Sequence, residues 1–204
     1  LKRHLGIPVV ASLNGVSPSG WLDLGRELER GGADALELNV YHIVTDPRQS
    51  ADAVETRYVE LLTRLRATVR IPVAMKLSPF FSSLPHFVAR LEAAGGAGVA
   101  LFNRFYQPDI DLARLDLVDT LQLSTPDEVL LRLRWLAILR GQTAMTLAAT
   151  GGVHGAPDAL KLLLAGADVV HLASSLLQHG PERLRDILAG MEAWMEENEY
   201  DSVA

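Results

Sequence analysis

Residues 145–160 read Met-Thr-Leu-Ala-Ala-Thr-Gly-Gly-Val-His-Gly-Ala-Pro-Asp-Ala-Leu. The apolar first part predicts a buried β-strand over Met145–Thr150, and the last part predicts a helix that begins near Pro157. Between them, Gly151 and Gly152 leave backbone amides uncovered next to a helix N-terminus, and such an arrangement binds anions such as phosphate. A strand, a glycine loop and a helix in this order make one βα unit, the repeating element of parallel sheets.

The same unit recurs along the chain. Short apolar runs alternate with longer amphipathic stretches, which predicts six βα units in a single domain over residues 1–204. Strands this uniformly apolar are typical of a parallel sheet that is covered on both faces. The expected strands are Pro8–Leu13, Ala35–Asn39, Pro72–Leu77, Gly98–Asn103, Met145–Thr150 and Val169–Ser174. The expected helices are Trp21–Arg30, Ala51–Ala67, Leu84–Ala94, Pro126–Leu139, Pro157–Ala165 and Pro181–Asn198.

Two α/β architectures accept such a series, an open doubly wound sheet and a closed barrel. A barrel mouth draws ligand groups from every strand, whereas an open sheet gathers them at one switch point. Here almost every expected strand ends in a polar or glycine residue, which favours the barrel. These strand-end residues are Asn14, Asn39, Lys76, Asn103, Gly151-Gly152 and Ser174-Ser175.

The glycine loop and Ser174 also suggest which strands are present. In many (β/α)8 TIM barrels, a phosphate lies between the loops after strands seven and eight. If these loops are those two, the six units are strands three to eight, and two N-terminal βα units are missing. Either upstream residues or another chain then fills the gap, because a closed barrel leaves no strand edge unpaired.

Lys76 stands near the end of the apolar run Val73–Leu77. A charge at a buried rim is costly unless an anion or a polar ligand receives it, and Asn is a poor strand former. Together, Asn39, Lys76 and Asn103 therefore favour a ligand site. The plainer alternative is that each Asn begins a turn and that Lys76 pairs with Glu37.

Residues 104–125 exceed the usual βα loop of about 2 to 6 residues. Apolar and polar residues alternate within this excursion, which predicts a small hairpin over the barrel mouth. Such a hairpin would act as a lid or as an oligomer contact. Simple decoration of the fold is the alternative.

Composition excludes several classes of protein. The 204 residues are 49% hydrophobic and 22% charged, the balance of an ordinary globular domain, and the net charge of −6 includes no basic stripe for nucleic acid. The absence of cysteine excludes disulfides, thiolate nucleophiles and cysteine-ligated metals, and no metal site is expected. Neither an apolar run of about 20 residues nor a signal peptide is visible, so a cytoplasmic protein without a membrane partner is expected.

Several segments in the same order resemble the dihydroorotate dehydrogenases. The resemblance implies a (β/α)8 barrel that binds FMN and transfers a hydride between a dihydropyrimidine-like small molecule and flavin N5. It also implies a homodimer. The segments that carry it are Leu36–Asn39, Val73–Pro79, Phe102-Asn103, Ala149–Val153, Ala173–Leu177, His179–Pro181 and Tyr200–Val203.

The resemblance also implies roles for individual residues. Lys76 is expected beside the N1/O2 edge of the flavin ring, where a cation stabilises the charge of the reduced ring. Phe102 and Thr150 are expected at the cofactor, while Asn39 and Asn103 bind flavin and a planar substrate through hydrogen bonds. The residues expected to hold the FMN phosphate are Gly151, Gly152, Ala173 and Ser174.

Two departures from the family pattern indicate a side branch of the family. Where the family has Asn-x-Ser-Cys-Pro-Asn, this chain continues from Asn39 through Tyr41, His42 and Val44, without the usual Cys or Ser base. His42 falls on the base position, and its imidazole suits proton abstraction near neutral pH; a surface histidine in a loop is the alternative. Arg104 replaces a small hydroxyl residue and would fill and charge the substrate pocket, which makes an acidic substrate other than dihydroorotate plausible.

Two other functions remain compatible with these residues. Lys76 could form a Schiff base with a phosphorylated carbonyl compound, as in barrel lyases and aldolases. The chain could also be a non-catalytic flavin-binding barrel that has kept its phosphate site and lost its base.

Overall fold

The computed structural model describes residues 2–14, 18–40, 42–104, 107–118 and 121–203. Six parallel strands form the main sheet in the order β1-β2-β3-β4-β7-β8. These strands are β1 (Val10–Asn14), β2 (Ala35–Asn39), β3 (Val73–Leu77), β4 (Gly98–Leu101), β7 (Thr146–Thr150) and β8 (Val169–His171). The helices are α1 (Pro18–Arg30), α2 (Ala51–Arg66), α3 (Leu84–Ala93), α4 (Val129–Leu139), α5 (Ala156–Leu164), α6 (Ser174–His179) and α7 (Arg183–Glu197), with a 3₁₀ turn, η1 (Pro126–Glu128), before α4.

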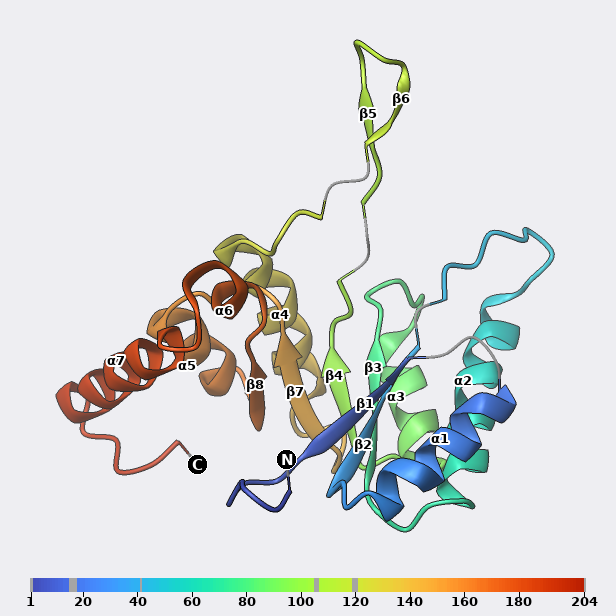
Figure 1. The fold of residues 1–204 in the computed structure, drawn as a ribbon, viewed down its shortest axis with the longest axis horizontal. Coiled ribbons are helices and arrows are strands. Elements are labelled where there is room, and N and C mark those ends of the chain that lie inside the picture. The colour runs from blue at the N-terminus through green and yellow to red at the C-terminus, as the bar shows by residue number, and fades with distance from the viewer. Residues whose placement is uncertain (1, 15–17, 41, 105–106, 119–120, 204) are drawn as a thin grey trace.

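The sheet curls into a half-barrel. Figure 1 shows the strands standing between two groups of helices, α1–α3 on one side and α4–α7 on the other. Strand order follows chain order, and each neighbouring pair is parallel. These observations confirm the α/β class and the series of βα units. No helix in the described ranges is long and apolar enough to cross a membrane.

The two faces of the sheet differ in character. Along β3, Val73, Met75 and Leu77 are fully buried under the helices, whereas Ala74 and Lys76 on the other, concave face are only partly buried. Side chains alternate between faces along a strand, so a strand with one apolar face also presents a second set of residues. The expected apolar strands are therefore found on the helix-covered face, while on the concave face Lys76 is partly buried beside the buried Ala100 and Ala148 of the next two strands.

Two predicted strands are too long. The strand expected over Val169–Ser174 ends at His171, and Ser174 is instead the first residue of α6. The chain turns at Ala173, whose carbonyl accepts a hydrogen bond from the N–H of Leu177 at 3.0 Å and so closes the first turn of α6. The strand expected over Gly98–Asn103 ends at Leu101, although the Asn103 N–H still donates to the Leu77 carbonyl at 2.7 Å.

The excursion contains the predicted hairpin. Strands β5 (Asp109–Asp111) and β6 (Asp116–Val118) pair antiparallel. Figure 1 shows this hairpin standing away from the body of the molecule, so the expected lid is not formed by the hairpin in this structure. The segment 121–125 that returns from it to η1, here called the return leg, is the part of the excursion that reaches the strand ends.

Candidate functional site

A cavity of about 250 Å³ opens at the carboxyl ends of β2, β3, β4, β7 and β8. Every residue predicted to bind cofactor or substrate lines this strand-end cavity. Three further residues that were not predicted also line it. The predicted residues are Asn39, Lys76, Phe102, Asn103, Arg104, Thr150, Gly151, Gly152, Ala173 and Ser174, and the additional ones are Ser124, Val153 and His171. Asn14 and Ser175, which also end predicted strands, are not among the lining residues.

The glycine loop after β7 has room for no side chain. Gly151 and Gly152 have φ angles of +95° and +87°, which only glycine adopts at little cost. A Cβ atom at Gly152 would lie 2.7 Å from the backbone nitrogen of Val129, and one at Gly151 would lie 2.8 Å from the Arg132 guanidinium. The loop therefore presents bare backbone to the cavity.

Amide groups at this loop are divided between two tasks. The Asp158 carboxylate accepts hydrogen bonds from the N–H groups of His154 and Gly155, at 3.0 and 2.9 Å. Asp158 thus caps the N-terminus of α5, where the sequence predicted that a bound anion would lie. Within the described part of the chain, the amides of residues 151–153 have no protein acceptor, so these three remain for a ligand.

Arg132 supports the glycine loop from beneath. Its guanidinium is almost fully buried, donates to the Thr150 carbonyl at 2.9 Å and to the Glu128 carbonyl at 2.8 Å, and forms an ion pair with the Glu128 carboxylate at 3.4 Å. Burial lowers the pKa of Arg132, and the charge of Glu128 opposes that change. A guanidinium nonetheless stays cationic in proteins, so a fixed positive charge lies under the loop.

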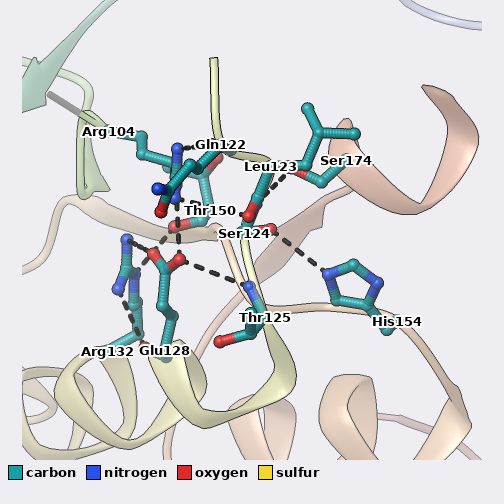
Figure 2. A network of polar contacts seen from close by, with 10 residues as sticks. All are labelled: Arg104, Gln122, Leu123, Ser124, Thr125, Glu128, Arg132, Thr150, His154 and Ser174. Carbon is teal, nitrogen blue, oxygen red and sulfur yellow. Dashed lines mark hydrogen bonds and ion pairs between the residues drawn. The ribbon is translucent and has the colours of Figure 1, made fainter. Parts of the chain in front are cut away.

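Arg104 joins the return leg to Glu128 of η1 (Figure 2). Its guanidinium donates to the carbonyls of Gln122 and Leu123, and its Nε contacts the Glu128 carboxylate at 3.3 Å. Glu128 also accepts the N–H of Thr125, at 3.3 Å. All three guanidinium nitrogens of Arg104 therefore have protein partners. Arg104 lines the cavity as predicted, but these contacts hold a loop, and its role toward substrate stays a prediction.

Ser124 joins the return leg to two other parts of the site. Its N–H donates to the Ser174 hydroxyl at 3.0 Å, and its own hydroxyl lies 3.3 Å from Nε2 of His154 (Figure 2). Ser124 is 3% exposed. Sequence reasoning missed it because its partners lie 30 and 50 residues further along the chain.

Lys76 contacts Glu37 across neighbouring strands. Its Nζ lies 3.6 Å from Oε1 of Glu37, which also accepts a hydrogen bond from the Ser12 hydroxyl at 2.9 Å. The alternative prediction from the sequence, that Lys76 pairs with Glu37, is thus confirmed. Because Lys76 also lines the cavity, the ion pair and a ligand site are compatible.

Asn39 brings an unsatisfied group to the cavity. Its Oδ1 is buried and has no hydrogen-bond partner among the described residues. Buried polar atoms nearly always have a partner, so this oxygen is suited to accept an N–H from a bound ring. Asn103, by contrast, is held by a weak hydrogen bond of 3.4 Å from its Nδ2 to the Lys76 carbonyl.

His42 lies apart from the other predicted residues. It lines a second, mostly apolar cavity of about 370 Å³, together with Val44, Tyr58 and Phe81 among others. Its Nε2 is buried without a partner in the described ranges, and burial raises the pKa of Tyr58 to about 12. Tyr41 lies outside the described residues. The structure does not bring His42 together with Lys76 and the asparagines, and its role as a base stays a prediction.

Comparisons with known proteins identify the family of this chain. Residues 2–195 match the family model described as "Dihydroorotate dehydrogenase". The chain is 29% identical over 196 residues to "Dihydroorotate dehydrogenase A (fumarate)" of Lactiplantibacillus plantarum, covering 94% of this chain and 64% of that protein. It is 25% identical over 215 residues to "Dihydroorotate dehydrogenase B (NAD(+)), catalytic subunit" of Thermoplasma acidophilum, covering 100% and 68%. It is 26% identical over 203 residues to the protein of the same name from Methanothermobacter thermautotrophicus, covering 97% and 67%.

The chain thus spans about two thirds of the length of these relatives, from 64% to 68%. The family match covers nearly all of it, including the strand-end cavity and the glycine loop. This chain belongs to the dihydroorotate dehydrogenase family.

Proposed function

We propose that this chain holds FMN in the strand-end cavity of an oxidoreductase of dihydroorotate dehydrogenase type. The cofactor, when bound, accepts a hydride at its N5 from a carbon of a dihydropyrimidine-like substrate. The observation that supports this proposal most is the single cavity that combines Lys76 with the bare amides of the glycine loop. The six strands would then be strands three to eight of a closed (β/α)8 barrel.

The residues of the cavity fit the chemical groups of FMN. The amides of residues 151–153 and the Ser174 hydroxyl suit a phosphate, because several N–H and O–H donors converge on one anion. Oδ1 of Asn39 can accept a ring N–H. Lys76, paired with Glu37, supplies a positive charge beside the ring edge where negative charge develops on reduction.

The proposal assigns substrate binding to Asn39, Asn103 and Arg104, and it assigns proton abstraction to His42. A base must reach the proton that it abstracts, and His42 lines a different cavity from Asn103. A His42→Gln variant that kept the wild-type rate of substrate-driven flavin reduction, with an unchanged pH profile, would exclude His42 as the base.

The Schiff-base alternative is disfavoured by one contact. A lysine must lose its proton to attack a carbonyl, whereas Lys76 forms an ion pair with the buried Glu37 at 3.6 Å. Borohydride trapping of a phosphorylated carbonyl compound on Lys76 would revive that alternative.

The experiment that tests the proposal adds FMN to the purified full-length protein and follows flavin absorbance and fluorescence. We expect a yellow complex that dihydroorotate bleaches without oxygen. Absence of a bound chromophore would refute the proposal. A complex that dihydroorotate does not bleach would instead point to another substrate or to the non-catalytic flavin-binding barrel.

A homodimer is a further proposal, supported by apolar side chains on the hairpin. Leu112 and Leu115 are each 83% exposed, and Ile110 and Leu117 are 60% and 66% exposed. Light scattering should give the dimer mass for the wild type and the monomer mass for a Leu112→Asp/Leu115→Asp variant. A wild-type monomer would refute this proposal. Cytoplasmic location stays a prediction from the sequence.

A further inference from the structure

Two basic side chains, from β3 and β8, contact the Glu37 carboxylate of β2 on the concave face. Lys76 of β3 places Nζ 3.6 Å from Oε1 of Glu37 on β2. His171 of β8 places Nδ1 4.0 Å from the other oxygen, Oε2. Glu37 is 10% exposed in its side chain, Lys76 is 20% exposed and His171 is 36% exposed. One carboxylate thus lies between a permanent cation and a group that becomes a cation only when it takes up a proton.

The charged neighbours of His171 are few. Burial lowers its pKa most, the charge of Glu37 raises it, and the charge of Lys76 lowers it further. On the adjacent strand β7, the residue in register with His171 is the neutral Thr150. Arg104 lines the same cavity, but its ion pair is with Glu128. Among the described residues, Glu37 and Lys76 therefore set the electrostatic environment of this imidazole.

We infer that His171 is a positioning residue of the strand-end cavity, and that it takes up a proton from solvent when negative charge arrives beside Lys76. While no ligand charge lies beside Lys76, its ammonium repels a second cation at Glu37, which disfavours protonation of His171. Negative charge at Lys76 removes that repulsion, and the new imidazolium then binds Oε2 of Glu37. The cluster itself is a property of this chain, whereas the source of the negative charge, reduced flavin, rests on the proposed function.

The first test needs no cofactor. Nuclear magnetic resonance of histidine-labelled protein gives the His171 titration, with the resonance assigned by its loss in His171→Gln. Removing the cation in Lys76→Met should raise the His171 pKa by about half a unit or more, and Glu37→Gln should lower it similarly. Lys76→Arg, which keeps the charge, should leave it unchanged. The exposed His86 of α3 serves as the internal control.

Identical His171 titrations in the wild type, Lys76→Met and Glu37→Gln would overturn the inference. Circular dichroism of each variant checks that the fold is intact, and Glu37→Gln keeps the test decisive if Lys76→Met unfolds. A shift shared by His86 would mean a general change in the protein and would also contradict the cluster.

The second test separates this inference from the proposed function. FMN bound to the full-length protein is reduced at an electrode at several pH values, which counts the protons taken up with the electrons. We expect the wild type to take up more protons than His171→Gln, by a fraction of a proton that is largest near the His171 pKa. Equal uptake by both proteins overturns the inference, while failure of both to bind FMN refutes the proposed function and leaves the first test standing.

Discussion

The ammonium of Lys76 lies 3.6 Å from the carboxylate of Glu37 on the neighbouring strand, and the same ammonium lines the strand-end cavity. The pair explains how a charged residue can stand on an otherwise apolar strand, because Glu37 offsets the cost of burying the cation. It also places an ion-paired ammonium at the cavity where the proposed chemistry needs a positive charge. Structure and function therefore depend on the same contact.

Removing the charge of Lys76 should slow hydride transfer. Lys76→Met is expected to reduce the rate of substrate-driven flavin reduction by about 10²-fold, because the negative charge that develops on the ring loses its counter-charge. Stopped-flow absorbance measures this rate. Lys161→Met on the exposed face of α5 is the matched control and should keep the wild-type rate. Lys76→Met also removes the ion-pair partner of Glu37. The double variant Lys76→Met/Glu37→Gln therefore shows whether the lower rate comes from misfolding. Recovery of the full rate in the double variant would contradict the role of Lys76.

The glycine loop offers a test with an internal control. Gly152 and Gly141 have φ angles of +87° and +83°, but a Cβ at Gly152 would lie 2.7 Å from backbone and one at Gly141 would meet nothing within 4 Å. Both alanine variants should lose about 1 to 2 kcal/mol from the left-handed backbone. Thermal unfolding measures that loss. Only Gly152→Ala should lose more stability than this and bind FMN more weakly, because only its Cβ meets backbone atoms. Equal losses of stability and equal FMN affinities in the two variants would contradict this explanation.

Arg104 should act through the return leg. Arg104→Ala frees Gln122, Leu123 and Glu128 from the guanidinium, so the return leg should become more sensitive to limited proteolysis and FMN affinity should fall by about tenfold. Arg114→Ala in the hairpin, where the side chain is 84% exposed, is the control. If Arg104→Ala instead raised only the KM for substrate, with proteolysis unchanged, direct substrate binding would be its role.

Asp168 should make stability depend on pH. Its carboxylate accepts the Leu147 N–H at 2.8 Å and pairs with Arg140 at 2.8 Å. Although burial opposes it, these contacts hold the pKa of Asp168 below the ordinary value of 3.8. Because its folded-state pKa is lowered, Asp168 stabilises the folded protein above pH 3.8. This stabilisation is lost as the pH falls through the folded-state pKa of Asp168.

Asp168→Asn should therefore cost about 0.5 to 1 kcal/mol near neutral pH, allowing for the partial exposure of the pair, and should lower Tm by about 1 to 4 °C. Calorimetry at pH 7 and at pH 3 measures both values. The difference from wild type should shrink at pH 3. Asp23→Asn, in an exposed pair with Arg26, should have little effect at either pH. A penalty for Asp168→Asn that grew in acid would contradict the assignment.

Local patterns in the sequence predicted what depends on local chemistry. Strand β7, the glycines after it and Lys76 near the end of β3 follow from alternation, turn chemistry and the cost of burying charge. The short helix α6 was missed because six residues, Ser174–His179, carry no helical periodicity that separates them from the end of a strand. Asp158 was missed as a cap because the glycine loop alone does not reveal which amides are already bonded.

Residues that depend on long-range contacts could not be predicted. Ser124 enters the site because the excursion folds back onto Ser174, 50 residues away in sequence. His171 enters it because the curl of the sheet brings β8 opposite β2, and no local pattern specifies that approach. The available signal was a polar residue within the otherwise apolar run of residues 169–173.

The most direct test of the central claim compares the dissociation constants of FMN and riboflavin, measured by fluorescence on the wild type and on Gly152→Ala. The two ligands differ by the phosphate, so the wild type should bind FMN at least about tenfold more tightly, and Gly152→Ala should lose most of that preference. Equal affinities for FMN and riboflavin in the wild type would contradict a phosphate held by the glycine loop.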